Sequence, residues 1–552
     1  MKTRKIKIIS TSLVLVIIAG FFSFTERGDR YFEIAKNLDI FATLFKEVNA
    51  YYVDEVNPNT LMKTGIDAML KSLDPYTNYI PEDDIENFRT LSTGQYGGIG
   101  AQTRRINGKV YVRMIFEGTP AHTGGLKIGD EVVAIEDIPI KGLSRSEVSK
   151  LIKGQINTPV SLTVSRYNKP DDIKLQFKRK KITIKSVPYF GMIDNEIGYL
   201  KLTEFTMHAG RDVRNAVEDL KEQGAKKIIL DLRDNPGGLL IEAVNIVNVF
   251  IPKGEEIVYT KGKINENNSS YKTLNNPVDA DIPLVILINS GSASASEIVS
   301  GAVQDFDRGV LVGERSYGKG LVQMTRPLSY NSQLKVTTAK YYIPSGRSIQ
   351  VIDYSHRKPD GSVGKIPESL KSAFKTRNGR VVYDGGGIAV DIEVINTSLP
   401  PIATSLLFGG LLFDYVTEYY YGHNEIAPAS EFELSDKVYN EFINWLKDKN
   451  YSYTTKVEKK VEELTASAKQ EKYYDEIKDD LIKLKENILK NKNTDLYLQK
   501  DIIKYLLEEE IVSRYYLEKG EIEVSFAKDV VLIEAINVFK NLDRYYQILS
   551  AN

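Results

Sequence analysis

Between Lys181 and Asp391 the sequence alternates short apolar segments with segments of helical periodicity, and this alternation restricts the possible folds more than any other feature. Residues 227–232 and 284–288 are almost continuously apolar, which is typical of strands buried on both faces. Helical patterns follow at residues 239–250 and 294–306. We therefore predict a largely parallel sheet covered by helices, as in α/β domains.

Composition excludes several classes of function. The chain has 552 residues, which suffices for about three or four domains. It carries 73 Lys and Arg against 74 Asp and Glu, so no basic excess is available for nucleic acid, and we expect none as a partner. It has no cysteine and only four histidines. Disulfides, thiolate nucleophiles and cysteine-bound metals are therefore excluded.

The N-terminus has the pattern of an export or anchoring segment. Lys2, Arg4, Lys5 and Lys7 precede the apolar residues 8–24, and such a charged flank places the rest of the chain outside the cytoplasm. A bulky residue, Phe21, follows Ala19-Gly20, where a cleavage site would need small residues. We expect residues 1–29 to be an uncleaved membrane anchor, with a removed signal peptide as the alternative.

Residues 93–168 have the order of elements that resembles a PDZ domain. Short strands broken by glycines surround helical segments at 121–126 and 144–152. In such domains a glycine loop holds a terminal carboxylate through its N–H groups, while the peptide adds as a strand. The expected peptide-binding residues are Tyr96, Gly97, Gly98, Ile99 and Gly100. A small β domain without a ligand is the alternative.

Helical patterns occupy both flanks of these domains. Residues 30–92 predict two or three short helices, and residues 396–552 are helical, charged and rich in tyrosine. In the latter region Ile477, Leu481, Leu484 and Ile488 form an apolar face. We expect packing or an oligomerisation arm there, and no chemistry.

Ser294 lies where a buried strand gives way to a helix. This position exposes a small side chain at the edge of the sheet, and the helix N-terminus favours a developing oxyanion. The same residues also fit a capping box, in which Ser294 pairs with Glu297. Ser292 or Ser296 could be the cap instead. The residues alone leave both a nucleophile and a helix cap open.

Two further loops follow strands of the predicted sheet. Tyr317-Gly318-Lys319-Gly320 comes after residues 309–313, and the loop 234–238 comes after residues 227–232. Because the carboxyl ends of parallel strands share one edge, Lys319 and Ser294 can meet there. A lysine base must be neutral, so burial has to lower its pKa by about three units, at about 4 kcal/mol. A surface lysine in a tight turn is the alternative.

Taken together, these segments resemble the C-terminal processing proteases, also called tail-specific proteases. That family consists of serine peptidases with a PDZ domain inserted in a crotonase-like α/β core. The resemblance covers about residues 30–395. It runs through residues 73–77, the PDZ segment, Asp231-Leu232-Arg233-Asp234-Asn235-Pro236-Gly237-Gly238, residues 291–297, Gly318-Lys319-Gly320 and Val322-Gln323.

The resemblance implies a role for each matching residue. Ser294 is the expected nucleophile, Lys319 the general base and Gln323 the residue that orients the lysine. The oxyanion hole is expected from the N–H of Ala295 and of Gly237 or Gly238, with Asp305 as a supporting acid. This chemistry needs no metal and no cofactor.

We therefore expect an α/β crotonase-like protease core at residues 169–395, with an inserted PDZ domain and helical regions at 30–92 and 396–552. The expected activity is a serine endopeptidase that cleaves exported proteins near their C-terminus after capturing the terminal carboxylate. The expected partners are proteins or peptides with free C-termini, a membrane through the N-terminal segment, and a second copy or an adaptor. The expected location is the periplasmic side of a bacterial inner membrane, anchored or secreted.

Three alternatives remain. Ser294 could act with His208 and Asp234 as a triad. The chain could instead be a non-catalytic adaptor, in which the PDZ domain binds tails and the α/β core is a scaffold. A crotonase-type acyl-CoA enzyme would share the core but gives no reason for a PDZ domain or an export segment.

Overall fold

The protein was studied as a computed structural model that describes residues 30–395, 399–492 and 494–550. The expected anchor at residues 1–29 lies outside these described residues. The chain divides into two units, Met1–Tyr79 with Thr325–Val336 and Ile80–Met324 with Thr337–Asn552. In the first unit, residues 30–51 are helical and are followed by α2 (Pro58–Lys71). No helix within the described ranges combines the length and apolarity that crossing a bilayer requires.

The α/β part of the second unit is built on a six-stranded sheet in which β15 (Leu284–Ile288) is buried at every residue. Its strand order is β10-β11-β12-β15-β16-β23. All neighbouring pairs are parallel except β10 with β11. The predicted parallel sheet is therefore confirmed. The remaining bounds are β10 (Tyr189–Met192), β11 (Ile197–Lys201), β12 (Lys227–Asp231), β16 (Val310–Gly313) and β23 (Ile392–Glu393).

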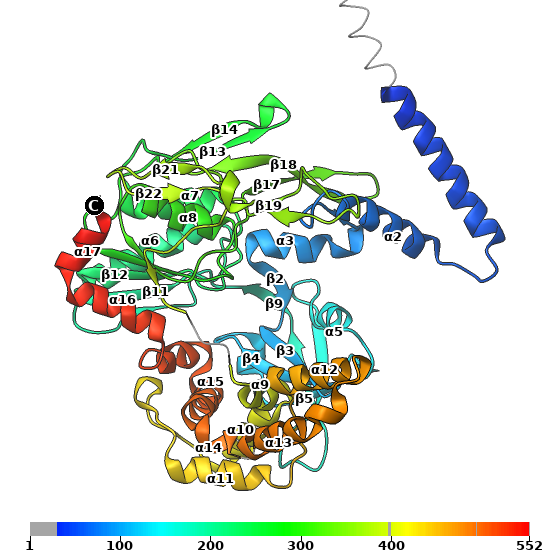
Figure 1. The fold of residues 1–552 in the computed structure, drawn as a ribbon, viewed down its shortest axis with the longest axis vertical. Helices are drawn as coiled ribbons and strands as arrows, with labels where there is room; N and C mark the ends of the chain where they lie inside the picture. The colour runs from blue at the N-terminus through cyan, green and yellow to red at the C-terminus, as the bar shows by residue number, and fades with distance from the viewer. Residues whose placement is uncertain (1–29, 396–398, 493, 551–552) are drawn as a thin grey trace, which may run out of the picture. The chain divides into compact units, whose positions relative to one another are not determined.

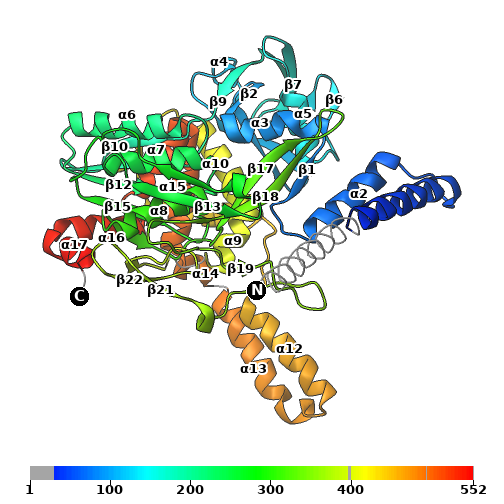
Figure 2. The same cartoon turned by 90° about the horizontal axis from the view of Figure 1, so that it is seen from above.

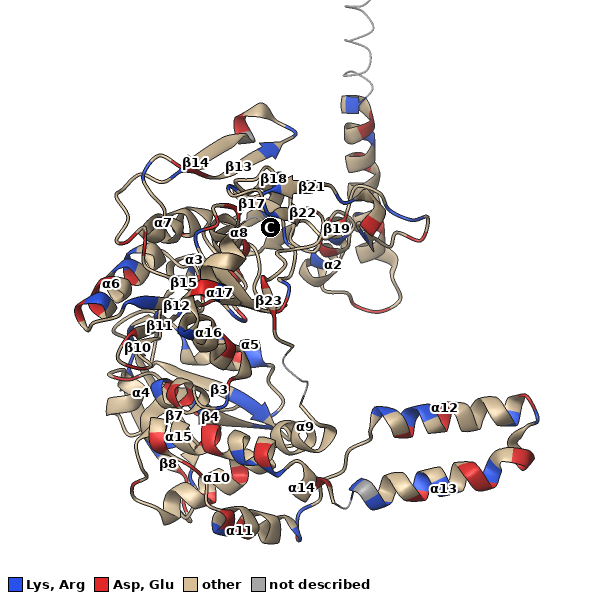
Figure 3. Ribbon diagram, turned by 60° about the vertical axis from the view of Figure 1, so that its left-hand side comes forward, with Lys and Arg blue, Asp and Glu red and all other residues tan. Residues whose placement is uncertain are grey.

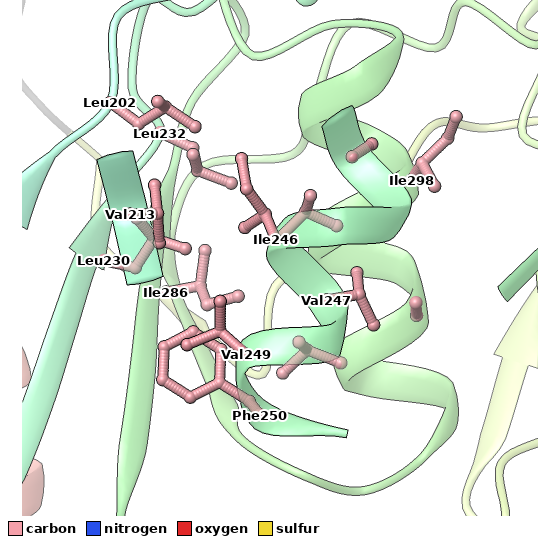
Figure 4. Close-up of a cluster of buried hydrophobic side chains, with 14 of the residues drawn as sticks. Leu202, Val213, Leu230, Leu232, Ile246, Val247, Val249, Phe250, Ile286 and Ile298 are labelled. Atoms are coloured by element: carbon pink, nitrogen blue, oxygen red, sulfur yellow. The ribbon is translucent and has the colours of Figure 1, made fainter. Parts of the chain in front are cut away.

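Three helices cover one face of this sheet: α6 (Ala209–Glu222), α7 (Leu240–Phe250) and α8 (Ala295–Asp305). Side chains from alternate positions of the strands point at these helices, as Figure 4 shows for Leu230 and Ile286 beside Ile246 and Phe250. These side chains are fully buried, and burying each contributes about 1.5–3 kcal/mol. The layer fixes α8, the helix that Ser294 precedes.

The opposite face is covered by the end of the chain. The helices α16 (Val530–Lys540) and α17 (Leu542–Leu549) pack on Val285, Leu287 and Val312. Figure 2 shows them across the strands from α6 and α7. Both helices belong to the region 396–552, for which we expected packing or an oligomerisation arm, and here they pack on the sheet. Strands that are apolar on both sides need cover on both sides.

The segment that resembles a PDZ domain forms a second sheet with the order β3-β4-β5-β7-β8, and β6 pairs β5. It continues through β8, so the domain extends past residue 168. Its bounds are β3 (Ala101–Ile106), β4 (Lys109–Ile115), β5 (Glu131–Ile135), β6 (Ile138–Pro139), β7 (Pro159–Ser165), β8 (Ile173–Lys178), α4 (Pro120–Thr123) and α5 (Arg145–Ile152). The chain enters along β2 (Gln95–Gly98) and leaves along its partner β9 (Lys180–Thr183). These two strands precede and follow the domain (Figure 1).

The C-terminal helices form their own core around residues such as Phe442 and Ile503. The helices α12 and α13 run side by side and carry charges of both signs along their length (Figure 3). The long helix α15 contains a break at Leu517, where φ is 56° and ψ is −149°. The bounds are α9 (Pro401–Phe408), α10 (Leu411–Gly422), α11 (Asp436–Leu446), α12 (Lys456–Gln470), α13 (Tyr474–Lys492), α14 (Asp495–Leu498) and α15 (Lys500–Ser525).

The remaining elements among the described residues are strands, one helix and four 3-10 helices. The strand β13 pairs with β14 and with β18, and α3 precedes the PDZ domain. The bounds are β1 (Asn78–Ile80), α3 (Ile85–Thr93), β13 (Glu256–Gly262), β14 (Ser269–Lys272), β17 (Leu321–Pro327), β18 (Gln333–Tyr342), β19 (Ile352–Asp353), β20 (Gly364–Lys365), β21 (Ala373–Lys375) and β22 (Val381–Tyr383). Short 3-10 helices occupy η1 (Glu82–Asp84), η2 (Asn265–Asn267), η3 (Glu368–Leu370) and η4 (Ala429–Glu431).

Candidate active site

Ser294 sits on a sharp turn between β15 and α8. Its backbone has φ 56° and ψ −110°, a conformation that is unfavourable for a residue with a Cβ atom and occurs mainly at functional sites. Ordinary helix caps are extended instead. Ser294 is also half-buried, whereas Ser292 and Ser296 are fully buried. The turn therefore presents Ser294 and hides its two serine neighbours.

The buried carboxylate of Glu297 joins the Ser294 turn to the lysine loop. Its Oε2 accepts the N–H of Ser294 at 2.8 Å and that of Lys319 at 2.9 Å. Its Oε1 accepts the N–H of Gly318 at 2.7 Å and the hydroxyl of Ser316 at 2.5 Å. Burial raises the pKa of Glu297, and these hydrogen bonds oppose that rise. The bond from the Ser294 N–H belongs to the capping box that the sequence predicted, whereas the bonds from the lysine loop were not predicted.

The lysine loop comes directly after β16, on the same edge of the sheet. Lys319 is half-buried. The N–H of Tyr317 donates to the carbonyl of Ser292 at 3.0 Å, and the hydroxyl of Tyr341 reaches the carbonyls of both Ser294 and Lys319, at 3.2 and 2.7 Å. The structure thus brings the main chains of the two predicted dyad residues together.

The glycine loop after β12 lies against the same turn. A Cβ atom on Gly237 would come within 2.9 Å of both the Ala295 nitrogen and the Ser294 Cβ. The N–H of Gly237 donates to the Asn235 side chain at 2.9 Å. A parallel bridge joins Gly238 to Phe205. Its two hydrogen bonds run from the N–H of Phe205 to the carbonyl of Gly237 and from the N–H of Leu239 to the carbonyl of Phe205, so the N–H of Gly238 takes no part in it. Of the two candidate glycines, Gly238 is therefore better suited to an oxyanion hole.

Asn235 is a further organising residue that sequence reasoning did not single out. It is fully buried, and its Nδ2 donates to the carbonyl of Leu202 at 2.8 Å. Its own carbonyl accepts the N–H of Ala293 and the hydroxyl of Ser296, at 3.0 and 2.9 Å. These bonds hold the glycine loop against the start of α8. The only sequence signal was the turn-forming pair Asn235-Pro236.

Two other predicted site residues, Gln323 and Asp305, make contacts with other parts of the chain. Gln323 donates from Nε2 to the hydroxyl of Thr337 at 3.2 Å. Asp305 is at the far end of α8, roughly 15 Å along the helix axis from Ser294. There it forms a buried ion pair with Arg347 at 2.8 Å. This position indicates a structural role for Asp305, in fixing the end of α8.

The alternative triad finds no support in these contacts. His208 begins α6 with φ 77° and lines a pocket with Lys185 and Arg211. The Asp234 carboxylate instead accepts Nδ2 of Asn289 at 2.9 Å. Among the described residues, no cluster of three or more His, Asp or Glu side chains could hold a metal ion.

Of the expected peptide-binding residues, Tyr96, Gly97 and Gly98 lie in β2, which pairs with β9, and Ile99 and Gly100 form the loop between β2 and β3. The carbonyls of Ile99 and Gly100 accept N–H groups of Ala121 and Phe116, at 2.8 and 2.9 Å, which holds the loop from its carbonyl side. The next strand, β3, pairs only with β4 and is an edge strand. Burial raises the pKa of Tyr96 to about 12, and the ammonium of Lys153 lies 4.8 Å from its ring centroid. An edge strand beside such a loop suits peptide addition.

Comparison with known proteins gives the class. The chain matches the peptidase family S41 over residues 196–361, the PDZ domain over 97–177, and the C-terminal helical domain of probable PDZ-proteases over 402–539. It is 35% identical over 367 residues to a carboxy-terminal-processing protease of Bartonella bacilliformis, covering 65% of this chain and 82% of that protein. It is 38% identical over 316 residues to a probable CtpA-like serine protease of Staphylococcus aureus, covering 57% and 62%.

A solved structure, the photosystem II D1 C-terminal processing protease, also matches, with 26% identity, a TM-score of 0.35, and coverage of 64% of this chain and 92% of that one. The fold and the sequence relatives together define a serine-type peptidase that carries a PDZ domain. The chain belongs to peptidase family S41, with the carboxy-terminal-processing proteases.

Proposed function

We propose that this peptidase uses Ser294 as nucleophile and Lys319 as general base, and that it cleaves proteins near their C-terminus. One observation carries the proposal. The carboxylate of Glu297 binds the N–H of Ser294 and the N–H of Lys319 through the same oxygen. Two residues held by one buried group keep a constant separation, which proton transfer between their side chains requires.

The proposed reaction has two halves. The neutral amine of Lys319 takes the proton of the Ser294 hydroxyl while Oγ bonds to the scissile carbonyl carbon. The carbonyl oxygen becomes negative and faces the N–H groups of Ala295 and Gly238. Collapse expels the amine of the substrate, which takes the proton from Lys319. Water then attacks the acyl-enzyme while Lys319 accepts a proton from it. When the ester bond to Oγ breaks, Lys319 passes that proton to Ser294, which releases the acid and restores the hydroxyl and the neutral amine.

Substrate selection is proposed to rest on the PDZ domain. Its loop Tyr96 to Gly100 would bind the terminal carboxylate, and the tail would add beside β3. Proteins or peptides with free C-termini are the proposed substrates. Gln323 is proposed to orient the lysine loop through β17, and the crotonase-like classification of the core remains a prediction.

The proposed location follows from the N-terminal pattern alone. A basic flank before an apolar stretch directs export, so we propose that the protein acts on exported proteins on the periplasmic side of a bacterial inner membrane. Whether residues 1–29 stay as an anchor is tested by the apparent mass of the mature protein. Association with a second copy or an adaptor belongs to the same proposal.

The test uses two peptides that differ only in a free or amidated C-terminus. Ser294→Ala and Lys319→Ala should each lower kcat by about 10³-fold or more, and amidation should slow the wild type. Ser290→Ala and Lys340→Ala, exposed positions nearby, serve as controls and should cleave normally. Full activity of Lys319→Ala would refute the dyad, and indifference to amidation would refute tail capture. Binding without cleavage by the wild type would favour the adaptor.

A further inference from the structure

Tyr341 occupies an unusual place beside the active site. Its ring is 1% exposed and belongs to the core under α8. Its strand β18 is paired with β13, where Tyr341 lies opposite Thr260. Its N–H donates to the carbonyl of Gly320 at 3.0 Å. The ring is therefore fixed by packing and by main-chain bonds, and its hydroxyl has little freedom to move.

That hydroxyl touches both halves of the proposed dyad. It donates to the carbonyl of Lys319 at 2.7 Å and lies 3.2 Å from the carbonyl of Ser294. A tyrosine hydroxyl has one proton, so the shorter bond to Lys319 is the stronger one. The Ser294 carbonyl also accepts the N–H groups of Glu297 and Ile298. Tyr341 consequently acts most on the lysine loop.

Glu297 and Tyr341 hold the same residues from opposite sides. The carboxylate binds the N–H groups of Ser294 and Lys319, whereas the phenol binds their carbonyls. The peptide group that follows Lys319 is held at its N–H end, where Gly320 donates to Oε1 of Gln350 at 2.8 Å. The hydroxyl of Tyr341 holds the same peptide group at its carbonyl end, so the Lys319 side chain projects from a main chain that is fixed on both sides.

We propose that Tyr341 is a positioning residue that sets the Lys319 amine against the Ser294 hydroxyl. The inference rests on the proposed function of this pair. Its hydroxyl contacts main-chain carbonyls, so it acts on Lys319 through the main chain. Its loss should slow proton transfer without weakening substrate binding.

The test is Tyr341→Phe, which removes one oxygen atom and keeps the ring. We expect kcat to fall about tenfold, the effect of one buried hydrogen bond, with KM within twofold of wild type. The acid limb of the kcat/KM profile should move to higher pH, because a looser loop admits water to the amine and favours its charged form. Tyr342→Phe is the control. The Tyr342 ring stacks on that of Tyr259, with 4.9 Å between the ring centroids, and we expect this variant to match wild type.

A merely structural role predicts a different result. Loss of packing would lower the unfolding midpoint and the active fraction, but would leave the pH profile of the folded enzyme unchanged. Rates are therefore measured well below the unfolding midpoint, together with the rate at which a fluorophosphonate labels Ser294. A Tyr341→Phe enzyme with wild-type kcat and acid limb would overturn the proposal while Lys319→Ala stays inactive. Activity in Lys319→Ala would overturn the dyad itself, so the two failures are distinguishable.

Discussion

At Gly237 the structure of the site requires a residue without a side chain. Its φ of +98° lies in the region that favours glycine, and a Cβ atom there would meet the Ala293 oxygen at 2.7 Å. The same Cβ would come within 2.9 Å of the Ala295 nitrogen, a proposed oxyanion-hole donor. Two separate penalties, backbone strain and collision with the Ser294 turn, therefore apply to any substitution.

We expect Gly237→Ala to lower kcat by at least about 10²-fold, the usual cost of disturbing an oxyanion hole. The control is Gly254→Ala, which has φ +95° but nothing within 4 Å of its Cβ. It carries the strain without the collision and should lose about 1 kcal/mol of stability with normal kcat. Steady-state kinetics and urea unfolding measure both. Equal activity of the two variants would show that contact with the Ser294 turn does not matter.

Helix α15 connects several parts of the second unit. Its Leu517, at the break in the helix, packs against the PDZ core. Its Glu521 pairs with Arg113 of strand β4 at 2.6 Å. Beyond the end of α15, Asp529 caps the next helix, α16. It pairs with Arg233 of the loop after β12 at 2.6 Å. One helical segment thus contacts the PDZ domain and leads to the loop that carries Gly237.

Helix α15 also carries Glu509, a titratable group that makes the folding stability of the protein depend on pH. Burial raises the pKa of Glu509 to about 7, with the negative charges of Glu521 and Glu510 adding to the rise and Tyr505 and Arg113 opposing it. The folded state therefore holds a proton that the unfolded state releases near 4.5. Stability must fall as pH rises from about 4.5 to about 7, by at most about 1.4 kcal/mol per unit, and level off above.

Glu509→Gln should remove this dependence. We expect the variant to match wild type at pH 5, where Glu509 is protonated, and to be more stable at pH 8, where the wild type carries a poorly solvated charge. Free energies of unfolding from urea titrations at both pH values measure the difference. Asp501→Asn, an exposed change on the same helix, should show no such trend. A constant difference between Glu509→Gln and wild type at all pH values would contradict the assignment.

For the second unit as a whole, the central finding is that its C-terminal helices complete the domain built on the sheet of residues 189–393. Helices α16 and α17 cover the face of the sheet that α6, α7 and α8 leave open. The hydroxyl of Tyr545 accepts the N–H of Leu284 at 3.0 Å, on the strand that leads to Ser294. The C-terminal segment is therefore part of the catalytic scaffold, in addition to any role in association.

Phe539 tests this conclusion without touching the site. It is 1% exposed on α16, whereas Ile533 on the same helix is 37% exposed. We expect Phe539→Ala to cost about 3–5 kcal/mol of unfolding free energy, and Ile533→Ala less than about 1. KM should be unchanged in both. If the two variants were equally stable, α16 would not be covering the core sheet.

The sequence predicted those features that depend on neighbouring residues. The continuous apolar run at 284–288 indicated a strand buried on both faces. Its position before a helix made Ser294 a candidate for a nucleophile or a helix cap, and the family resemblance favoured the nucleophile. The glycines of the PDZ loop were recognisable for the same reason. In each case the physical cause, periodicity or backbone freedom, is contained within a few consecutive residues.

Tertiary structure alone decided the rest. Glu297 turns inward to bind the lysine loop, and Tyr341 reaches two carbonyls. Both sets of contacts depend on segments brought together from separate parts of the chain. The cover that α16 and α17 provide is of the same kind. An apolar pattern predicts that a face of the sheet is buried, but it does not say which helix buries that face. Only the packing of the whole chain decides this.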